Sequence, residues 1–100
     1  MIEESKRAEF LVADHFEITG RGVVVLGKIL SGAFRAGMLA CGMEGFSPLT
    51  ITSVESLRGT NADISVGIAF REHSGLQTLR DQFPIGSVLT AHEKSIASAL

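Results

Sequence analysis

The stretch from residue 10 to residue 29, FLVADHFEITGRGVVVLGKI, contains two extended segments joined by a glycine-rich turn. In the first segment, apolar side chains recur at every second position, which is the period of a strand with one buried face. These side chains are Phe10, Val12, Phe16 and Ile18, and Asp14 falls on the same face. Gly20 and Gly22 allow the positive backbone angles of a tight turn. Three valines at 23–25 then favour a second strand, so the pattern predicts a hairpin.

Two residues of this hairpin predict specific contacts. A carboxylate on the apolar face of a strand needs a polar partner, and turn amides near Gly20 or Gly22, or the side chain of Arg21, are the candidates for Asp14. Gly27 interrupts the valine-rich strand, which indicates a bend or the close approach of another backbone segment.

The rest of the chain alternates short apolar segments with turns at intervals of about 8 to 12 residues, a spacing typical of a sandwich or barrel. Strands are expected over 10–18, 22–31, 38–43, 49–57, 64–70 and 87–91. In 49–57, one face carries Leu49, Ile51, Ser53, Glu55 and Leu57. Phe34, in the turn after the second strand, is expected to fold back onto the core.

Leucines and a phenylalanine at helical spacing in 74–84 predict a short helix or 3₁₀ turn before the last strand. The predicted fold is therefore all-β: a small closed antiparallel barrel of six to seven strands, without exposed sheet edges. The expected organisation is a charged lead-in over 1–9, the barrel over 10–91, and a short tail or helix over 92–100.

Composition bounds the protein class. A chain of 100 residues, 45% hydrophobic and 20% charged, is that of one globular domain. No apolar run is long enough to span a membrane, and the charged amino terminus is not expected to act as a signal peptide. The single cysteine, Cys41, fits a cytoplasmic location and a buried thiol. The net charge of −2 disfavours strong non-specific binding to RNA.

No motif indicates catalysis. Gly20 and Gly22 precede a strand, whereas phosphate-binding loops open a helix, and no G-x-x-x-x-G-K-[ST] motif occurs, so the chain alone is not expected to bind GTP. His15, His73 and His92 lack partners at metal-ligand spacing and are expected at the surface or at strand ends. No positioned serine suggests a hydrolase. We therefore predict neither an enzyme nor a cofactor or metal site.

The hairpin and the later strands resemble domain II, the β-barrel of translational GTPases typified by elongation factor Tu. The family pattern Phe-x-Val-x-Asp-Val-Phe-x-Ile-x-Gly-Arg-Gly, followed by a valine-rich strand, matches from Phe10 to Lys28, with His15 in place of valine. Further matches follow in order: TSVESLRG at 52–59, ISVGIAFRE at 64–72 and PIGSVLT at 84–90. The barrel is expected to stand without a preceding GTPase domain or a following third domain.

The resemblance implies a site. In elongation factor Tu this barrel helps to receive the aminoacyl end of transfer RNA, and the matching positions here are Asp14, Phe16, Val24, Glu55 and Arg58. Other positions depart from the family: Ala13 stands for glutamate, Leu26 for threonine, Leu57 for histidine or an aromatic residue, and Ser65 for asparagine. The polar contacts to an amino acid are therefore about half missing, although an adenine could still stack near Val24.

The same residues fit a purely structural interpretation. Phe16 and Val24 could pack the barrel, and Glu55 with Arg58 could form a weak surface pair. The resemblance implies a non-catalytic binding module whose partner is the ribosome, transfer RNA or a translation-related protein. The alternatives are a structural or regulatory subunit, a self-associating barrel, and a small-molecule site near Asp14, Glu55 and Arg58.

Overall fold

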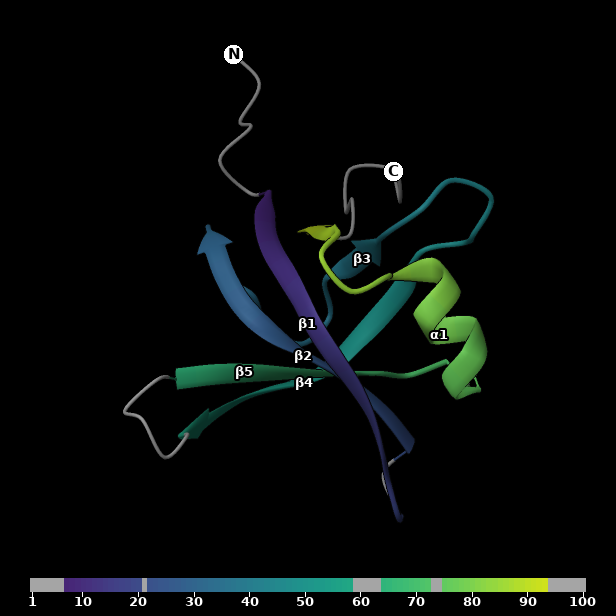
Figure 1. Ribbon diagram of the computed structural model, residues 1–100. Coiled ribbons are helices and arrows are strands. Elements are labelled where there is room, and N and C mark those ends of the chain that lie inside the picture. Colours follow the sequence, from purple (N-terminus) through teal and green to yellow (C-terminus); the bar gives the residue numbers. More distant parts are fainter. Residues whose placement is uncertain (1–6, 21, 59–63, 73–74, 94–100) are drawn as a thin grey trace.

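The computed structural model describes residues 7–20, 22–58, 64–72 and 75–93. Figure 1 shows long, strongly bent strands that cross one another, with one short helix to the side. The elements follow the chain in the order β1 (Ala8–Ile18), β2 (Gly22–Ser31), β3 (Leu39–Cys41), β4 (Leu49–Arg58), β5 (Ile64–Phe70), α1 (Leu76–Gln82) and β6 (Val88–His92). The predicted strands and the predicted helix are thus present, and β1 begins two residues earlier than expected.

The strands form one closed antiparallel barrel in the order β1-β2-β5-β4-β3-β6. β1 pairs with β2 along most of its length, but with β6 only from Ala8 to Leu11. The tip of the β1–β2 hairpin therefore extends beyond β6. The prediction of a small closed antiparallel barrel is confirmed, with six strands.

Glycine makes the hairpin possible in two ways. At the turn, Gly20 and Gly22 have φ angles of 86° and 92°, in the region that side-chain-bearing residues rarely adopt. At Gly27 the backbone of β1 lies so close that a Cβ atom would overlap the carbonyl oxygen of Leu11. Both predictions for these glycines, a tight turn and a close backbone approach, are confirmed.

The barrel encloses a core of apolar side chains from every strand and from the helix. Phe34 folds back onto this core as predicted, and its ring meets that of Phe10 edge to face, with centroids 5.7 Å apart. Leu79 and Phe83 carry the helix onto the core, where Phe83 stacks on Phe70 at 5.5 Å. The largest fully buried residues are Phe10, Phe83, Met38, Ile51, Ile68, Leu79, Leu89, Gln82, Val12 and Val25.

Two β-bulges overturn the predicted face assignments. In β1 the register moves from Val12–Gly27 to Asp14–Leu26, so Ala13 is an extra residue. In β4 it moves from Ile51–Phe70 to Ser53–Ala69, so Thr52 is extra.

An extra residue reverses the inside–outside alternation downstream of it. Phe10 and Val12 are buried as predicted, but Phe16 and Ile18 face outward. In the same way, Ile51 stays inside while Ser53 and Glu55 do not share its face.

One further prediction is wrong, and others concern residues that the structure does not describe. Cys41 is half-buried rather than fully buried. The predictions for Arg21 and His73 lie outside the described residues. The same holds for the helix proposed at the carboxyl terminus, of which only His92 and Glu93 are described. Within the described part of the chain, no helix has the length and apolar character needed to cross a bilayer.

Candidate ligand-binding site

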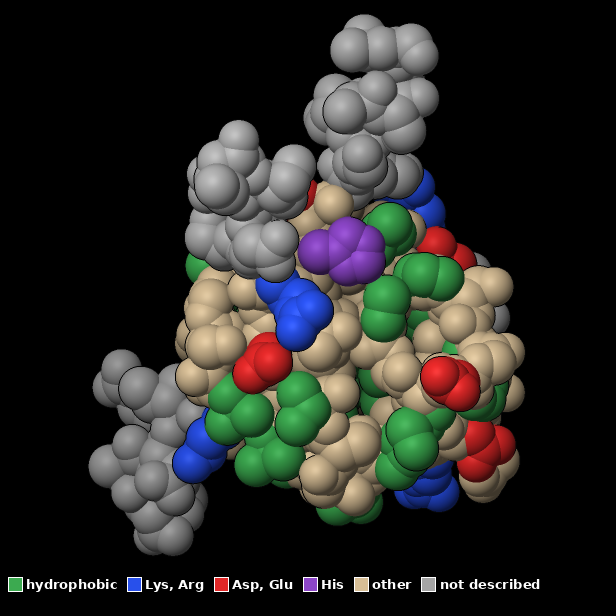
Figure 2. Space-filling view, turned by 90° about the horizontal axis from the view of Figure 1, so that it is seen from above, with side chains coloured by type: hydrophobic (Ala, Val, Ile, Leu, Met, Phe, Trp, Pro, Cys, Tyr) green, Lys and Arg blue, Asp and Glu red, His purple; other side chains and the backbone are tan. Residues whose placement is uncertain are grey.

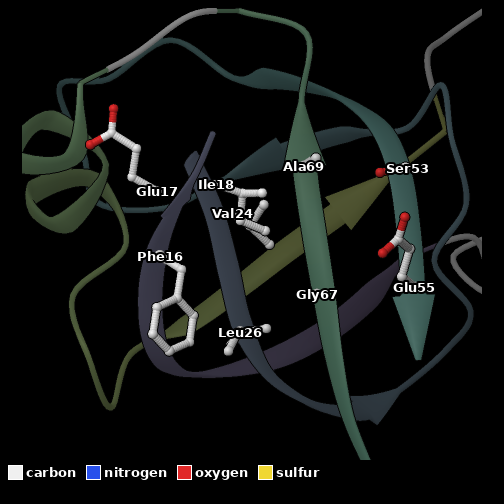
Figure 3. A pocket seen from close by; sticks show the side chains of 9 residues that line it. All are labelled: Phe16, Glu17, Ile18, Val24, Leu26, Ser53, Glu55, Gly67 and Ala69. Atoms are coloured by element: carbon white, nitrogen blue, oxygen red, sulfur yellow. The ribbon is translucent and has the colours of Figure 1, made fainter. Parts of the chain in front are cut away.

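A pocket of about 250 Å³ lies against the outer face of β2, β5 and β4 and beneath the end of β1 (Figure 3). Its surface is mostly apolar. The residues that line it are Phe16, Glu17 and Ile18 from β1, Val24 and Leu26 from β2, Ser53 and Glu55 from β4, and Gly67 and Ala69 from β5.

The floor of the pocket comes from the two central strands. Val24 pairs with Ala69, and Leu26 pairs with Gly67. The residues between them, Val25 and Ile68, are buried in the core, so strand alternation places the floor on the outer face of the barrel. Gly67 and Ala69 have little or no side chain, and this leaves the hollow.

The wall on one side comes from the end of β1. Phe16 and Ile18 remain 47% and 40% exposed, because the bulge at Ala13 turns them away from the core. Glu17 lies between them in sequence, and its side chain leaves the opposite face of the strand. Figure 3 shows the Glu17 carboxylate at the margin of the pocket, directed away from Val24. This wall is therefore apolar, and the Glu17 carboxylate is directed away from the hollow.

The opposite side of the pocket is polar. Ser53 and Glu55 are two residues apart on β4 and share its outer face, downstream of the bulge at Thr52. Figure 3 shows both side chains beyond β5 from Val24. Glu55 also takes part in an interaction within the chain. A ligand in the pocket would thus meet apolar groups on the β1 and β2 side, and a hydroxyl and a carboxylate on the β4 side.

The fold brings together three of the five residues implied by the family resemblance: Phe16, Val24 and Glu55. The backbone of Arg58 lies at the end of β4, paired with Ile64, and its side chain lies outside the described part of the structure.

Asp14 does not have the environment that the alternation predicted. It follows the bulge and is exposed, and its Oδ1 accepts a hydrogen bond of 2.8 Å from the N–H of its neighbour His15. Neither Arg21 nor a turn amide is needed to explain this carboxylate. It does not line the pocket.

The prediction for His15 is wrong. Its side chain is only 3% exposed, and its Nε2 lies 2.6 Å from the carbonyl oxygen of Phe83. Because a carbonyl oxygen only accepts, Nε2 must carry the proton. Nδ1 is buried without a hydrogen-bond partner among the described residues. This histidine joins β1 to the end of α1 and stands on the face opposite Phe16.

A second polar contact holds β4 beside the segment that follows β5. The N–H and hydroxyl of Thr50 donate hydrogen bonds of 2.7 Å and 3.0 Å to the two carboxylate oxygens of Glu72. Partial burial raises the pKa of Glu72. Four interactions lower this pKa more: hydrogen bonds from the N–H groups of Thr50 and Glu72, a hydrogen bond from the Thr50 hydroxyl, and the positive charge of Arg71. The pKa of Glu72 therefore lies below its ordinary 4.5.

Sequence reasoning misses most of the floor and the far side of the pocket. Alternation alone predicts that Ile18 lies in the core, and it assigns no binding role to Ser53 or Ala69. Leu26 is notable only as a departure from the domain II pattern. Ile18 and Ser53 face outward because each follows a bulge in its strand, and a single sequence does not reveal a bulge without glycine at that position. Leu26 and Ala69 lie on β2 and β5, where alternation with the buried Val25 and Ile68 could have placed them outside.

The pocket can hold a small group by burial and hydrogen bonding. Within the described residues, no cluster of three or more His, Cys, Asp and Glu side chains is arranged to hold a metal ion. No protein-family model and no curated protein matches this chain.

Proposed function

We propose that this chain is a non-catalytic binding module that acts in the cytoplasm and receives part of a partner molecule in the outer pocket. The observation that carries the proposal is the meeting of Phe16, Val24 and Glu55 around one cavity. Phe16 and Val24 are partners in the β1–β2 hairpin, and Glu55 joins them from β4, far along the chain. The family resemblance selects all three without reference to this geometry.

The exposure of Phe16 supports a binding role over a purely structural one. A large aromatic side chain that is 47% exposed contributes much less to the core than Phe10, which is fully buried. Exposed aromatic groups beside an apolar hollow are frequent anchors in recognition surfaces.

The resemblance to domain II of translational GTPases points to the translation apparatus as the source of the partner: the ribosome, transfer RNA or a translation-related protein. The test is recovery of partners from a lysate with the tagged full chain, before and after ribonuclease treatment. Ala69→Phe, which fills the pocket, should abolish recovery of the partner. Ala36→Phe, at an exposed position between β2 and β3, is the matched control. Equal recovery with both variants would count against the proposal.

A structural or self-associating role is the second candidate, and the exposed apolar side chains favour it. Ile85 is 64% exposed in the turn before β6, and Leu30 and Met43 are about half exposed. Figure 2 shows several hydrophobic side chains on one face of the molecule. Light scattering over a range of concentrations tests this candidate. A uniform monomer at high concentration would argue against it.

A further inference from the structure

We propose that the open edge of β1 near the hairpin tip is a strand-pairing surface that fits the same edge of a second copy of this chain, and that Asp14 keeps it closed. The edge lies on the side of β1 away from β2, whereas the pocket lies on the outer face of β2, β5 and β4. The inference is therefore independent of the proposed function.

The edge is open because β6 is short. β6 pairs with β1 only from Ala8 to Leu11. The segment before β6 adds two backbone hydrogen bonds at Val12: its N–H donates to the carbonyl oxygen of Ser87 at 3.0 Å, and its carbonyl oxygen accepts from the N–H of Gly86 at 2.8 Å. Beyond Val12, no backbone hydrogen bond from a described residue reaches this side of β1. In Figure 1, β6, in yellow, lies at the top of the view, whereas β1 continues to the bottom.

The backbone groups on the open edge belong to His15 and Glu17. Successive residues of an antiparallel strand direct their N–H and C=O groups alternately to its two sides. Val12 directs both groups away from β2, and the extra residue Ala13 shifts the alternation by one position. His15 and Glu17 therefore direct their N–H and C=O groups to the side that no described strand covers.

Asp14 occupies one of these groups. Its side chain is exposed, and its Oδ1 accepts the hydrogen bond of 2.8 Å from the N–H of His15. A strand added to this edge would have to displace the carboxylate before it could accept from the same N–H. Phe16 and Ile18 are exposed apolar residues beside the edge, and an edge of this kind invites pairing with another chain unless a charged side chain protects it. Asp14 has the position and the contact for this protection.

The edge is complementary to itself. A two-fold axis normal to the sheet would pair two β1 edges antiparallel and keep the outward-facing residues of both copies on one face. With Phe16 at the axis, the two Phe16 rings would be cross-strand neighbours, and His15 would lie opposite Glu17 of the second copy. The same register would set Asp14 opposite Ile18 of the second copy. Asp14 therefore opposes this pairing twice, because it covers the N–H of His15 and would place a carboxylate against an apolar side chain.

The test compares self-association of the full chain and its variants by sedimentation over a range of concentrations. Asp14→Ala should dimerise about tenfold more tightly than wild type or more, since one backbone hydrogen bond from each copy is no longer blocked. Glu44→Ala, in the exposed loop between β3 and β4, also removes an exposed carboxylate and should behave as wild type.

A second substitution shows whether the dimer forms through the edge. In the Asp14→Ala background, Glu17→Pro removes an N–H from the open edge and should return association to the wild-type level. Glu17→Ala removes the same carboxylate, keeps the N–H and should leave the dimer intact. If the proline variant does not fold, amide hydrogen exchange of Asp14→Ala provides the measurement: exchange at Glu17 should slow as the protein concentration rises.

Other results would overturn the inference. Equal association of wild type, Asp14→Ala and Glu44→Ala would mean that Asp14 does not close the edge. A dimer that persists in a folded Asp14→Ala, Glu17→Pro variant, or exchange at Glu17 that is independent of concentration, would place the contact elsewhere on the surface. None of these outcomes changes the recovery of a partner through the pocket, so the proposed function would stand or fall separately.

Discussion

His15 and Phe83 are joined by a hydrogen bond of 2.6 Å between the histidine Nε2 and the phenylalanine carbonyl oxygen, across 68 residues of sequence. This bond ties the bulged part of β1 to the end of α1, where Phe83 itself is buried in the core. The similar domain II pattern has valine at this position, so the chain places a polar group where the family places an apolar one.

Replacement of His15 by valine should therefore destabilise the fold. The carbonyl of Phe83 would lose this donor in a buried place, which costs about 1–3 kcal/mol. The measurement is the urea midpoint of unfolding. His92→Val, at an exposed position in β6, is the matched control and should change the midpoint little. An equal loss in both variants would mean that the buried hydrogen bond is not what stabilises the fold.

The two phenylalanines of β1 should respond differently to truncation. Phe10 is fully buried, so Phe10→Ala should cost about 3–5 kcal/mol of unfolding free energy. Phe16 is 47% exposed, so Phe16→Ala should cost about 1 kcal/mol or less while it weakens binding to the partner. Chemical denaturation and partner recovery measure the two effects. A large loss of stability for Phe16→Ala would indicate that this side chain packs in the core.

The turn between β1 and β2 should tolerate residues according to their backbone preference. At Gly22 no atom beyond the neighbouring residues lies within 4 Å of the position that a Cβ would take, so a side chain would meet strain without a clash. Gly22→Val should cost more than about 1 kcal/mol, because a β-branched residue strongly disfavours a positive φ. Gly22→Asn should cost less, since asparagine visits this region more readily. Equal melting temperatures for wild type and Gly22→Val would contradict the requirement for a positive φ angle at this turn.

Stability should fall in acid partly through Glu72. Its folded-state pKa lies below the ordinary 4.5, so the carboxylate stabilises the fold above that pH, and this contribution is lost as the pH falls through the lowered value. Glu72→Gln removes the titration while it keeps an oxygen for Thr50. From about pH 6 to pH 3, wild type should lose more stability than Glu72→Gln in urea titrations. Glu44→Gln, a variant of an exposed loop residue, should follow wild type.

The fold is predictable because its signals are local. Alternation, the glycines at 20 and 22 and the spacing of Leu79 and Phe83 each act within a few residues, and together they indicate a closed barrel with one helix. The interior position of Phe34 also follows from local pattern, since it is a large apolar residue set between two strands.

The site is only partly predictable because its geometry depends on the two bulges. Neither Ala13 nor Thr52 differs in type from an ordinary strand residue, yet each reverses the face of everything after it. Three of the residues that the resemblance selects, Phe16, Val24 and Glu55, line one pocket. The resemblance also selects Asp14, which lies beside the bulge and is held by the amide of His15.

The extra residue at Ala13 gives the hairpin a tolerance of length change. Deletion of Ala13 would join Val12 to Asp14 and leave a regular ladder with the same partners, so Phe16 and Ile18 would stay outside and His15 inside. Evolution could thus shorten this strand by one codon and leave the wall of the pocket in place.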